Sequence, residues 1–215
     1  TLGEVIQNSC NDGMMAIGRK MGAALLLDYQ SRFNFGSRTG IDLPNESSGA
    51  IYTLDQMKDM ELASTTFGQG FTSTMIQEIS AVSAVINGGT YYQPHVVKEI
   101  KSQEDGSVLK TNEGNVLKQI VSSDVSEKIR EYMGMSVTSG TSRKSKVQGY
   151  SMGGKTGTAE ILSTEEKDYL VSFIGFVVYP FLISNNFLNS TYTFSKFCLL
   201  SLPSSNNFFL LWKIL

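Results

Sequence analysis

The residues best suited to chemistry stand in segment 150–160, whose sequence is YSMGGKTGTAE. Lys155 offers a compact cation with three hydrogen-bond donors, and Thr156 and Thr158 offer hydroxyl groups beside backbone N–H groups. A glycine inside a strand, such as Gly157, lets a ligand or another backbone approach closely. This combination favours an anionic substrate that lies along a strand edge. A bare Lys-Thr-Gly tripeptide is more often a glycine-rich turn with a solvated lysine, so the context has to decide.

Two strands are predicted to position this segment. Residues 150–161 form the first, and the apolar, β-prone residues 169–179 form the second. Because the connection between them is short and polar, we expect antiparallel pairing. A turn signal at 103–106 predicts a further hairpin between a strand at 95–100 and a return strand at 107–110.

Helices are predicted to make up much of the rest of the chain. Apolar residues recur at helical spacing within residues 5–33, where Asp12 is a candidate N-cap. A short helix is predicted to begin at Thr53 or Asp55.

Two longer helices follow. The first carries an apolar stripe over residues 75–86 and ends at Asn87-Gly88-Gly89, as helices with C-terminal glycines do. The second is predicted to be capped within 122–124, with Asp124 and Glu127 at capping-box spacing. Helices and antiparallel strands together predict an α+β protein.

The composition argues against several classes of function. The 215 residues carry a formal net charge of −2 and no basic stripe with interleaved aromatic residues, so nucleic-acid binding is not expected. Cys10 and Cys198 lie far apart and His95 is the single histidine, so neither a metal site nor a Ser-His-Asp triad is predicted. No cofactor is predicted, and no apolar run is long enough to span a membrane.

Two short motifs stand in an informative order. Ser9-x-Asn11 lies early in the chain and Lys155-Thr-Gly157 lies late, as in penicillin-binding proteins and serine β-lactamases. Longer phrases are more specific, among them FGSRTGIDLP at 35–44, FGQG at 67–70 and QPHVVK at 93–98. Over roughly residues 1–178 the chain resembles the transpeptidase domain of bacterial class B penicillin-binding proteins, the group of cell-division and spore-wall peptidoglycan synthases.

The resemblance implies an incomplete penicillin-binding-protein/β-lactamase-like fold and acyl transfer from D-Ala-D-Ala stem peptides. It implies that Ser9 relays a proton to the leaving amine and that Asn11 hydrogen-bonds the substrate amide. It further implies that Lys155 supplies positive potential, and that Thr156-Gly157-Thr158 binds the terminal carboxylate of the substrate or of a β-lactam. The backbone N–H of Thr158 would form part of an oxyanion hole.

One expected motif is missing. The family's nucleophilic serine stands in an S-x-x-K helix upstream of S-x-N, and the one formal match here, Ser107–Lys110, lies downstream in the predicted hairpin. We reject that match and expect no nucleophile in this chain. The chain is therefore expected to be a transpeptidase fragment that is inactive alone and lacks part of its sheet.

The composition changes after Pro180. Residues 181–215 are rich in Ser and Asn and contain no Asp, Glu or Gly, and no periodic element can be identified there. We therefore expect a partial transpeptidase domain at 1–180 and an atypical tail at 181–215 that does not belong to the original domain.

The resemblance also implies a cellular setting. The parent protein is expected to be membrane-anchored on the extracytoplasmic face, with divisome or elongasome partners, and to act in cell-wall synthesis, cell division or cell shape. Two alternatives stay open: a serine β-lactamase or β-lactam-sensor domain of the same fold, and a non-catalytic cell-wall-binding piece.

Overall fold

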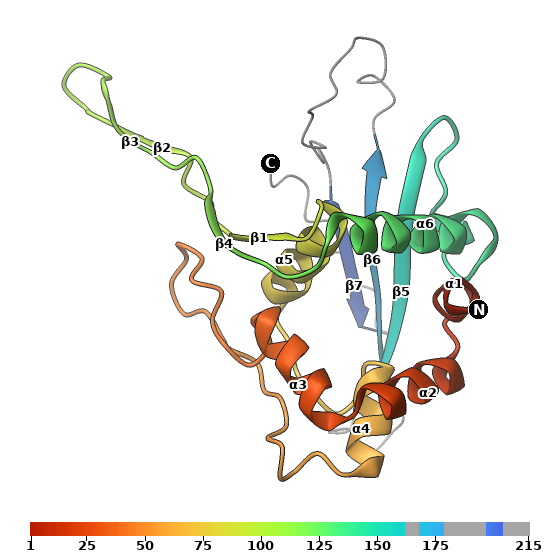
Figure 1. The fold of residues 1–215 in the computed structure, drawn as a ribbon. Coiled ribbons are helices and arrows are strands. Elements are labelled where there is room, and N and C mark those ends of the chain that lie inside the picture. The colour runs from red at the N-terminus through yellow and green to blue at the C-terminus, as the bar shows by residue number, and fades with distance from the viewer. Residues whose placement is uncertain (162–167, 179–196, 204–215) are drawn as a thin grey trace.

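The computed structural model describes residues 1–161, 168–178 and 197–203 (Figure 1). Helices gather below and in front of one sheet, and a long two-stranded arm projects from the side (Figure 1). The helices are α1 (Leu2–Gln7), α2 (Asn11–Met21), α3 (Ala23–Arg32), α4 (Asp59–Thr66), α5 (Met75–Ile86), α6 (Ser123–Ser139) and the short 3₁₀ helix η1 (Arg143–Ser145).

The described strands form three antiparallel sheets. They are β1 (Thr90–Gln93), β2 (Glu99–Lys101), β3 (Val108–Thr111), β4 (Asn115–Gln119), β5 (Ser151–Ile161), β6 (Asp168–Val178) and β7 (Phe197–Pro203). The order β5-β6-β7 makes the largest sheet, while β1 pairs with β4 and β2 pairs with β3. The predicted antiparallel pairing of the two late strands is confirmed, with Lys155 opposite Ile174 in the register.

Among the described residues, one of two clusters of buried apolar residues lies between this sheet and helices α5 and α6. The other centres on Ala84, Tyr91 and Ile120. Ile86, Met133 and Phe176 pack together in the first cluster and are almost fully buried, at 0%, 6% and 2% exposure. Helix α6 crosses the face of β5 and β6 (Figure 1). A side chain on Gly153 would collide with the ring of Phe176, so this glycine serves core packing.

The helical region at 5–33 is confirmed, but it is divided into α1, α2 and α3. Cys10 caps α2, so the predicted cap at Asp12 is wrong. The helix expected to begin at Thr53 or Asp55 begins at Asp59 instead, because residues 53–57 close a hydrogen-bonded turn.

Helix α5 has the predicted bounds, and Asn87 is its C-cap. The N-cap of α6 is Ser122, whose hydroxyl accepts a hydrogen bond from the backbone N–H of Val125. The expected capping box from Asp124 to Glu127 is therefore wrong, because the cap lies two residues earlier.

The long loop between α3 and α4 is held by one buried side chain. Gln77 has 0% exposure, and the two hydrogens of its Nε2 are shared among the carbonyls of Asn34, Ser37 and Ser48, which lie at 2.8–2.9 Å. Since these hydrogen bonds are shielded from water, they fix the loop without regular secondary structure.

The arm begins where that loop meets the chain after β1. The Asp42 carboxylate accepts hydrogen bonds from the backbone N–H groups of Val96 and Val97, at 2.7 and 2.9 Å. This contact bends the chain, so the strand predicted at 95–100 is limited to β2. The hairpin between β2 and β3 is confirmed. Strand β4, which extends the arm back to α6, was not predicted.

Part of the tail is described. Strand β7 pairs antiparallel with β6, from Leu170 opposite Pro203 to Phe176 opposite Phe197. The sequence contained no periodic signal for this strand. The remainder of segment 181–215 lies outside the described residues.

Candidate active site

Lys155 and Ser9 are in contact although they lie 146 positions apart in the sequence. The Lys155 Nζ donates to Ser9 Oγ at 2.7 Å and to the carbonyl oxygen of Thr156 at 2.7 Å. The structure thus brings together the two motifs that the sequence identified at opposite ends of the chain.

A tight turn between α1 and α2 presents Ser9. The backbone N–H of Cys10 donates to the carbonyl of Val5 at 2.9 Å, and Ser9 adopts a left-handed backbone with φ of 53°. This conformation costs a non-glycine residue about 1 kcal/mol. Ser9 therefore stands at a position where the chain reverses between two helices.

Asn11 lies beside Ser9 as the first residue of α2. It is exposed, as are Ser9 and Cys10. Its side chain is thus accessible to a ligand, and its contact with a substrate amide is part of the function proposed below.

Burial changes the acid–base behaviour of Lys155. Loss of hydration lowers the pKa of its ammonium group from the ordinary value of 10.5. A lower pKa increases the fraction of neutral amine at a given pH, and a neutral amine can accept a proton from the Ser9 hydroxyl. The pair at 2.7 Å therefore has the geometry for proton transfer in either direction.

The predicted carboxylate-binding residues continue along β5. Thr156 is half-buried and Thr158 is exposed. Among the described strands β5 pairs only with β6, so its second edge has no strand partner there, and an unpaired edge is the kind of surface that binds extended peptides. A Cβ atom on Gly157 would stand 2.5 Å from Ser172 Oγ, so a side chain there would require the Ser172 hydroxyl to rotate away.

A third element connects the turn that carries Ser9 with strand β5, and the sequence did not predict this contact. The end of α6 and the residues after it, Ser139-Gly140-Thr141, contact Gln7 at the end of α1. Gln7 Nε2 donates to Ser139 Oγ at 2.8 Å, and the N–H of Thr141 donates to the Gln7 carbonyl at 3.1 Å. Only its Ser-Gly-Thr composition, which is typical of a loop, marked this segment in the sequence.

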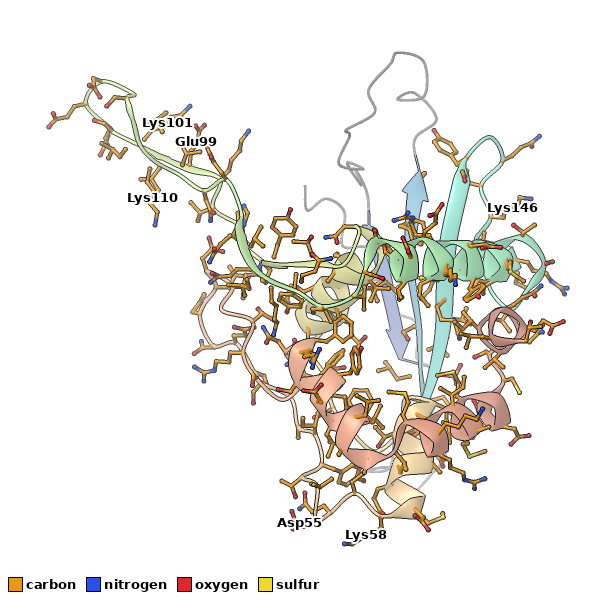
Figure 2. The ribbon with its side chains drawn as sticks, in the orientation of Figure 1. Asp55, Lys58, Glu99, Lys101, Lys110 and Lys146 are labelled. Atoms are coloured by element: carbon orange, nitrogen blue, oxygen red, sulfur yellow. The ribbon has the colours of Figure 1, made fainter. Side chains whose placement is uncertain are left out.

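The formal S-x-x-K match lies elsewhere. Ser107 belongs to the turn before β3, where its hydroxyl donates to Asp105 Oδ1 at 2.7 Å. Lys110 lies on the arm that projects away from the sheet (Figure 2). These two residues are thus not part of the Lys155–Ser9 arrangement.

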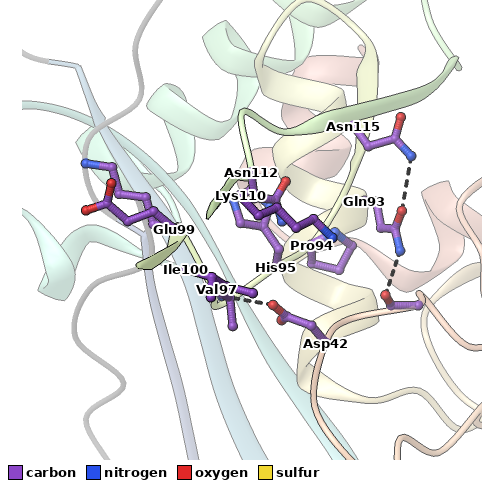
Figure 3. A pocket seen from close by; sticks show the side chains of 12 residues that line it. Asp42, Gln93, Pro94, His95, Val97, Glu99, Ile100, Lys110, Asn112 and Asn115 are labelled. Atoms are coloured by element: carbon purple, nitrogen blue, oxygen red, sulfur yellow. Dashed lines mark hydrogen bonds between the residues drawn. The ribbon is translucent and has the colours of Figure 1, made fainter. Parts of the chain in front are cut away.

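A hollow of about 420 Å³ lies at the base of the arm, lined partly by the phrases at 35–44 and 93–98, and it contains neither the Ser9-x-Asn11 nor the Lys155-Thr-Gly157 motif. Its walls include Asp42, His95 and Lys110 (Figure 3). Many of its polar groups already bond to one another, since Gln93 donates to the Gly40 carbonyl and accepts from Asn115. We therefore locate the chemistry at Lys155 and Ser9, where motif residues converge.

Among the described residues, no three His, Cys, Asp or Glu side chains gather as they would around a metal ion. In the same part of the chain, the helices are all too short or too polar to cross a bilayer.

The comparison with protein families decides the class. The penicillin binding protein transpeptidase domain family matches residues 1–183. The chain belongs to this family. The class B assignment and the α+β penicillin-binding-protein fold predicted from the sequence are confirmed.

Curated relatives of this transpeptidase domain include stage V sporulation protein D of Bacillus subtilis, which is 42% identical over 176 residues, or 80% of this chain. The peptidoglycan D,D-transpeptidase FtsI of Escherichia coli K12 is 26% identical over 82% of the chain. The chain spans only 27% and 28% of the lengths of these two relatives.

A solved structure is similar over much of the domain. Penicillin binding protein 3 of Mycobacterium tuberculosis, complexed with aztreonam, aligns with a TM-score of 0.75 and 27% identity. The alignment covers 82% of this chain and 42% of that one.

Proposed function

We propose that this transpeptidase domain supplies one wall of a penicillin-binding D,D-transpeptidase site that cross-links peptidoglycan stem peptides. The observation that carries the proposal is the 2.7 Å hydrogen bond between Lys155 and Ser9, beside the open edge of β5. It combines a proton-transfer pair with a strand edge suited to an extended peptide. Relatives named as peptidoglycan D,D-transpeptidases support the same reaction.

In the first step, a serine hydroxyl gives its proton to the lysine of its own S-x-x-K motif, which returns it in the second step, and the serine oxygen attacks the carbonyl between the two terminal D-Ala residues. The amide bond breaks, an acyl-enzyme ester forms, and the leaving amine receives a proton through Ser9 from Lys155. In the second step, the amine of a neighbouring stem attacks the ester, the serine hydroxyl is restored, and the amine proton returns through the same pair.

The strand would bind and orient the substrate. The Thr158 hydroxyl donates to the terminal carboxylate, which β-lactams also carry, while Thr156 lines the same binding site with its hydroxyl donated to Thr141 Oγ1. Asn11 hydrogen-bonds the amide next to the reacting carbonyl. The Thr158 N–H stabilises the oxyanion of the tetrahedral intermediate, a contribution of about 3 kcal/mol for a typical donor. The missing side chain at Gly157 keeps the backbone accessible.

The attacking serine is not among these 215 residues in our proposal, since the one S-x-x-K match lies on the arm. The isolated chain would then hold ligands but form no acyl-enzyme. We further propose that the parent protein acts on the extracytoplasmic face of the membrane, where peptidoglycan is built, with divisome or elongasome partners.

Fluorescent penicillin tests the proposal. The 215-residue chain should take up no covalent label, while the intact native protein should be acylated. In the native protein Lys155→Ala should slow acylation by about 10²–10⁴-fold, because a proton-transfer group is lost. The matched control is Lys146→Ala, which removes an exposed lysine beside α6 (Figure 2) and should react like the native protein.

Three outcomes would contradict parts of the proposal. Covalent labelling of the 215-residue chain would show that it contains a nucleophile. Rapid release of hydrolysed penicillin would favour a β-lactamase. A native protein that binds peptidoglycan but is never acylated would favour a non-catalytic wall-binding role.

A further inference from the structure

Thr141 contacts both chain segments that carry the Lys155–Ser9 pair. Its Oγ1 lies 3.4 Å from the carbonyl of Gln7, to which it donates, and it accepts from Thr156 Oγ1 at 3.4 Å. Gln7 is two residues before Ser9, and Thr156 follows Lys155 directly. One hydroxyl thus connects the chain on either side of the pair.

The Thr141 backbone strengthens this connection. Its N–H donates to the same Gln7 carbonyl at 3.1 Å, while the Gln7 side chain donates to Ser139 Oγ at 2.8 Å. Three hydrogen bonds therefore join the last residue of α1 to segment 139–141. The Gln7 carbonyl, which lies at the C-terminal end of a helix, gains partners that it would otherwise take from water.

Space around Gly140 is also limited. A Cβ atom at this position would collide with the Gln7 carbonyl oxygen and approach the Ser136 Cα at 2.8 Å. Helices α1 and α6 can therefore come this close only if residue 140 has no side chain.

The next residue connects segment 139–141 to β5. Ser142 is buried, and its hydroxyl meets Ser136 Oγ at 2.9 Å and the Gly154 carbonyl at 3.5 Å. The segment is thereby fixed to α6 and to the residue that precedes Lys155.

Building on the transfer reaction proposed above, we infer that Thr141 is a positioning residue that sets the approach of Ser9 to Lys155. It acts through Gln7 on one side and Thr156 on the other. Without its hydroxyl, the turn that carries Ser9 is held to β5 by fewer contacts, and the hydrogen bond of the pair lengthens in part of the population. The loss then affects proton transfer more than substrate binding.

The test compares Thr141→Val, which keeps the shape of the side chain, with Thr141→Ser, which keeps the hydroxyl. Thr138→Val is the matched control, because the exposed Thr138 hydroxyl bonds only within α6, to the Gly134 carbonyl at 2.9 Å. All three are made in the intact native protein, with acylation by fluorescent penicillin followed across pH.

Thr141→Val should slow acylation by about threefold to tenfold, the effect of one lost hydrogen bond. The apparent affinity for penicillin should change little, and the pH profile should move. Thr141→Ser should restore both the rate and the profile, and Thr138→Val should change neither. Equal effects of Thr141→Val and Thr138→Val, or no rescue by serine, would overturn the inference.

A second measurement is independent of activity. NMR of isotope-labelled lysine, assigned with Lys155→Arg, follows the titration of the Lys155 amine. In Thr141→Val this titration should move towards that of a solvated lysine, and it should not move in Thr138→Val. If the native protein is not acylated at all, the proposed function fails while this titration still decides the role of Thr141. An unchanged titration would overturn the inference.

Discussion

The hairpin β5–β6 and the hairpin β2–β3 share antiparallel pairing but differ in burial. Strand β5 pairs along 11 residues with β6, and α6 covers one face of the pair. In β2 and β3 every residue is exposed. An isolated two-stranded hairpin is only marginally stable in water, because a hydrogen-bond ladder alone contributes little. We conclude that burial under α6, rather than pairing, makes β5 rigid enough to hold Lys155.

The pKa values of the carboxyl groups also shift in opposite directions near α5 and in the arm. Glu78 in α5 is half-buried, and loss of hydration raises its pKa despite a hydrogen bond from Ser73. Asp42 at the root of the arm is exposed, and the N–H groups of Val97 and Val96 lower its pKa. The region around α5 therefore accommodates a poorly hydrated carboxyl group. The bend at the start of the arm is instead held by an ionised carboxylate.

Removal of the buried Phe176 ring should have the largest effect on the free energy of unfolding. Phe176→Ala should lower the free energy of unfolding by about 3–5 kcal/mol, because a cavity opens between the sheet and α6. On the arm, Leu109→Ala should change it by no more than about 0.5 kcal/mol, since that side chain is 66% exposed. Denaturant titration measures both. Comparable losses would mean that the arm contributes to the core.

Glu78→Gln should give a smaller effect that depends on pH. The raised pKa means that the contribution of Glu78 to stability is full below its ordinary pKa of 4.5 and is lost as pH rises through the folded-state pKa. The variant should therefore be more stable than the native chain at pH 7 and gain nothing at pH 4. Unfolding curves across this range test the expectation, and a difference independent of pH would contradict it.

The loss of the Asp42 charge should have the smallest effect, a local structural change confined to the arm. A lowered pKa means that Asp42 stabilises the bend above its ordinary pKa of 3.8, and that this contribution is lost as pH falls through the folded-state value. Asp42→Asn should shift the amide signals of Val96 and Val97 at neutral pH and leave those of β5 unchanged. Acidification of the native chain should reproduce the change. Shifts that spread into β5 would show that arm and sheet are coupled.

Much of the fold followed from local signals. Helix α5 and the β2–β3 hairpin were predicted because apolar spacing and turn residues act within a few positions. The arm strand β4 and the strand β7 were missed, since every residue of β4 except the partly buried Lys118 is exposed and β7 lies in a segment without periodicity. The α2 cap was misplaced because Cys10 Sγ accepts the hydrogen bond expected of Asp12.

The candidate site was only partly predictable. Ser9, Asn11 and Lys155 were found because their motifs are compact, and the structure brings Ser9 and Lys155 into contact. Thr141 and Gln7 were not found, since their importance arises from two helix ends that meet across more than 130 residues. Such a contact leaves no local pattern, so a tertiary structure is needed to reveal it.

The left-handed backbone at Ser9 has a consequence for protein engineering. Glycine would relieve the conformational cost there, so a screen that rewards folding alone would favour the loss of the Ser9 hydroxyl. Stabilised variants from such a screen would keep the shape of the site and lack its reacting partner. Selection for thermal tolerance in this chain should therefore hold residue 9 constant.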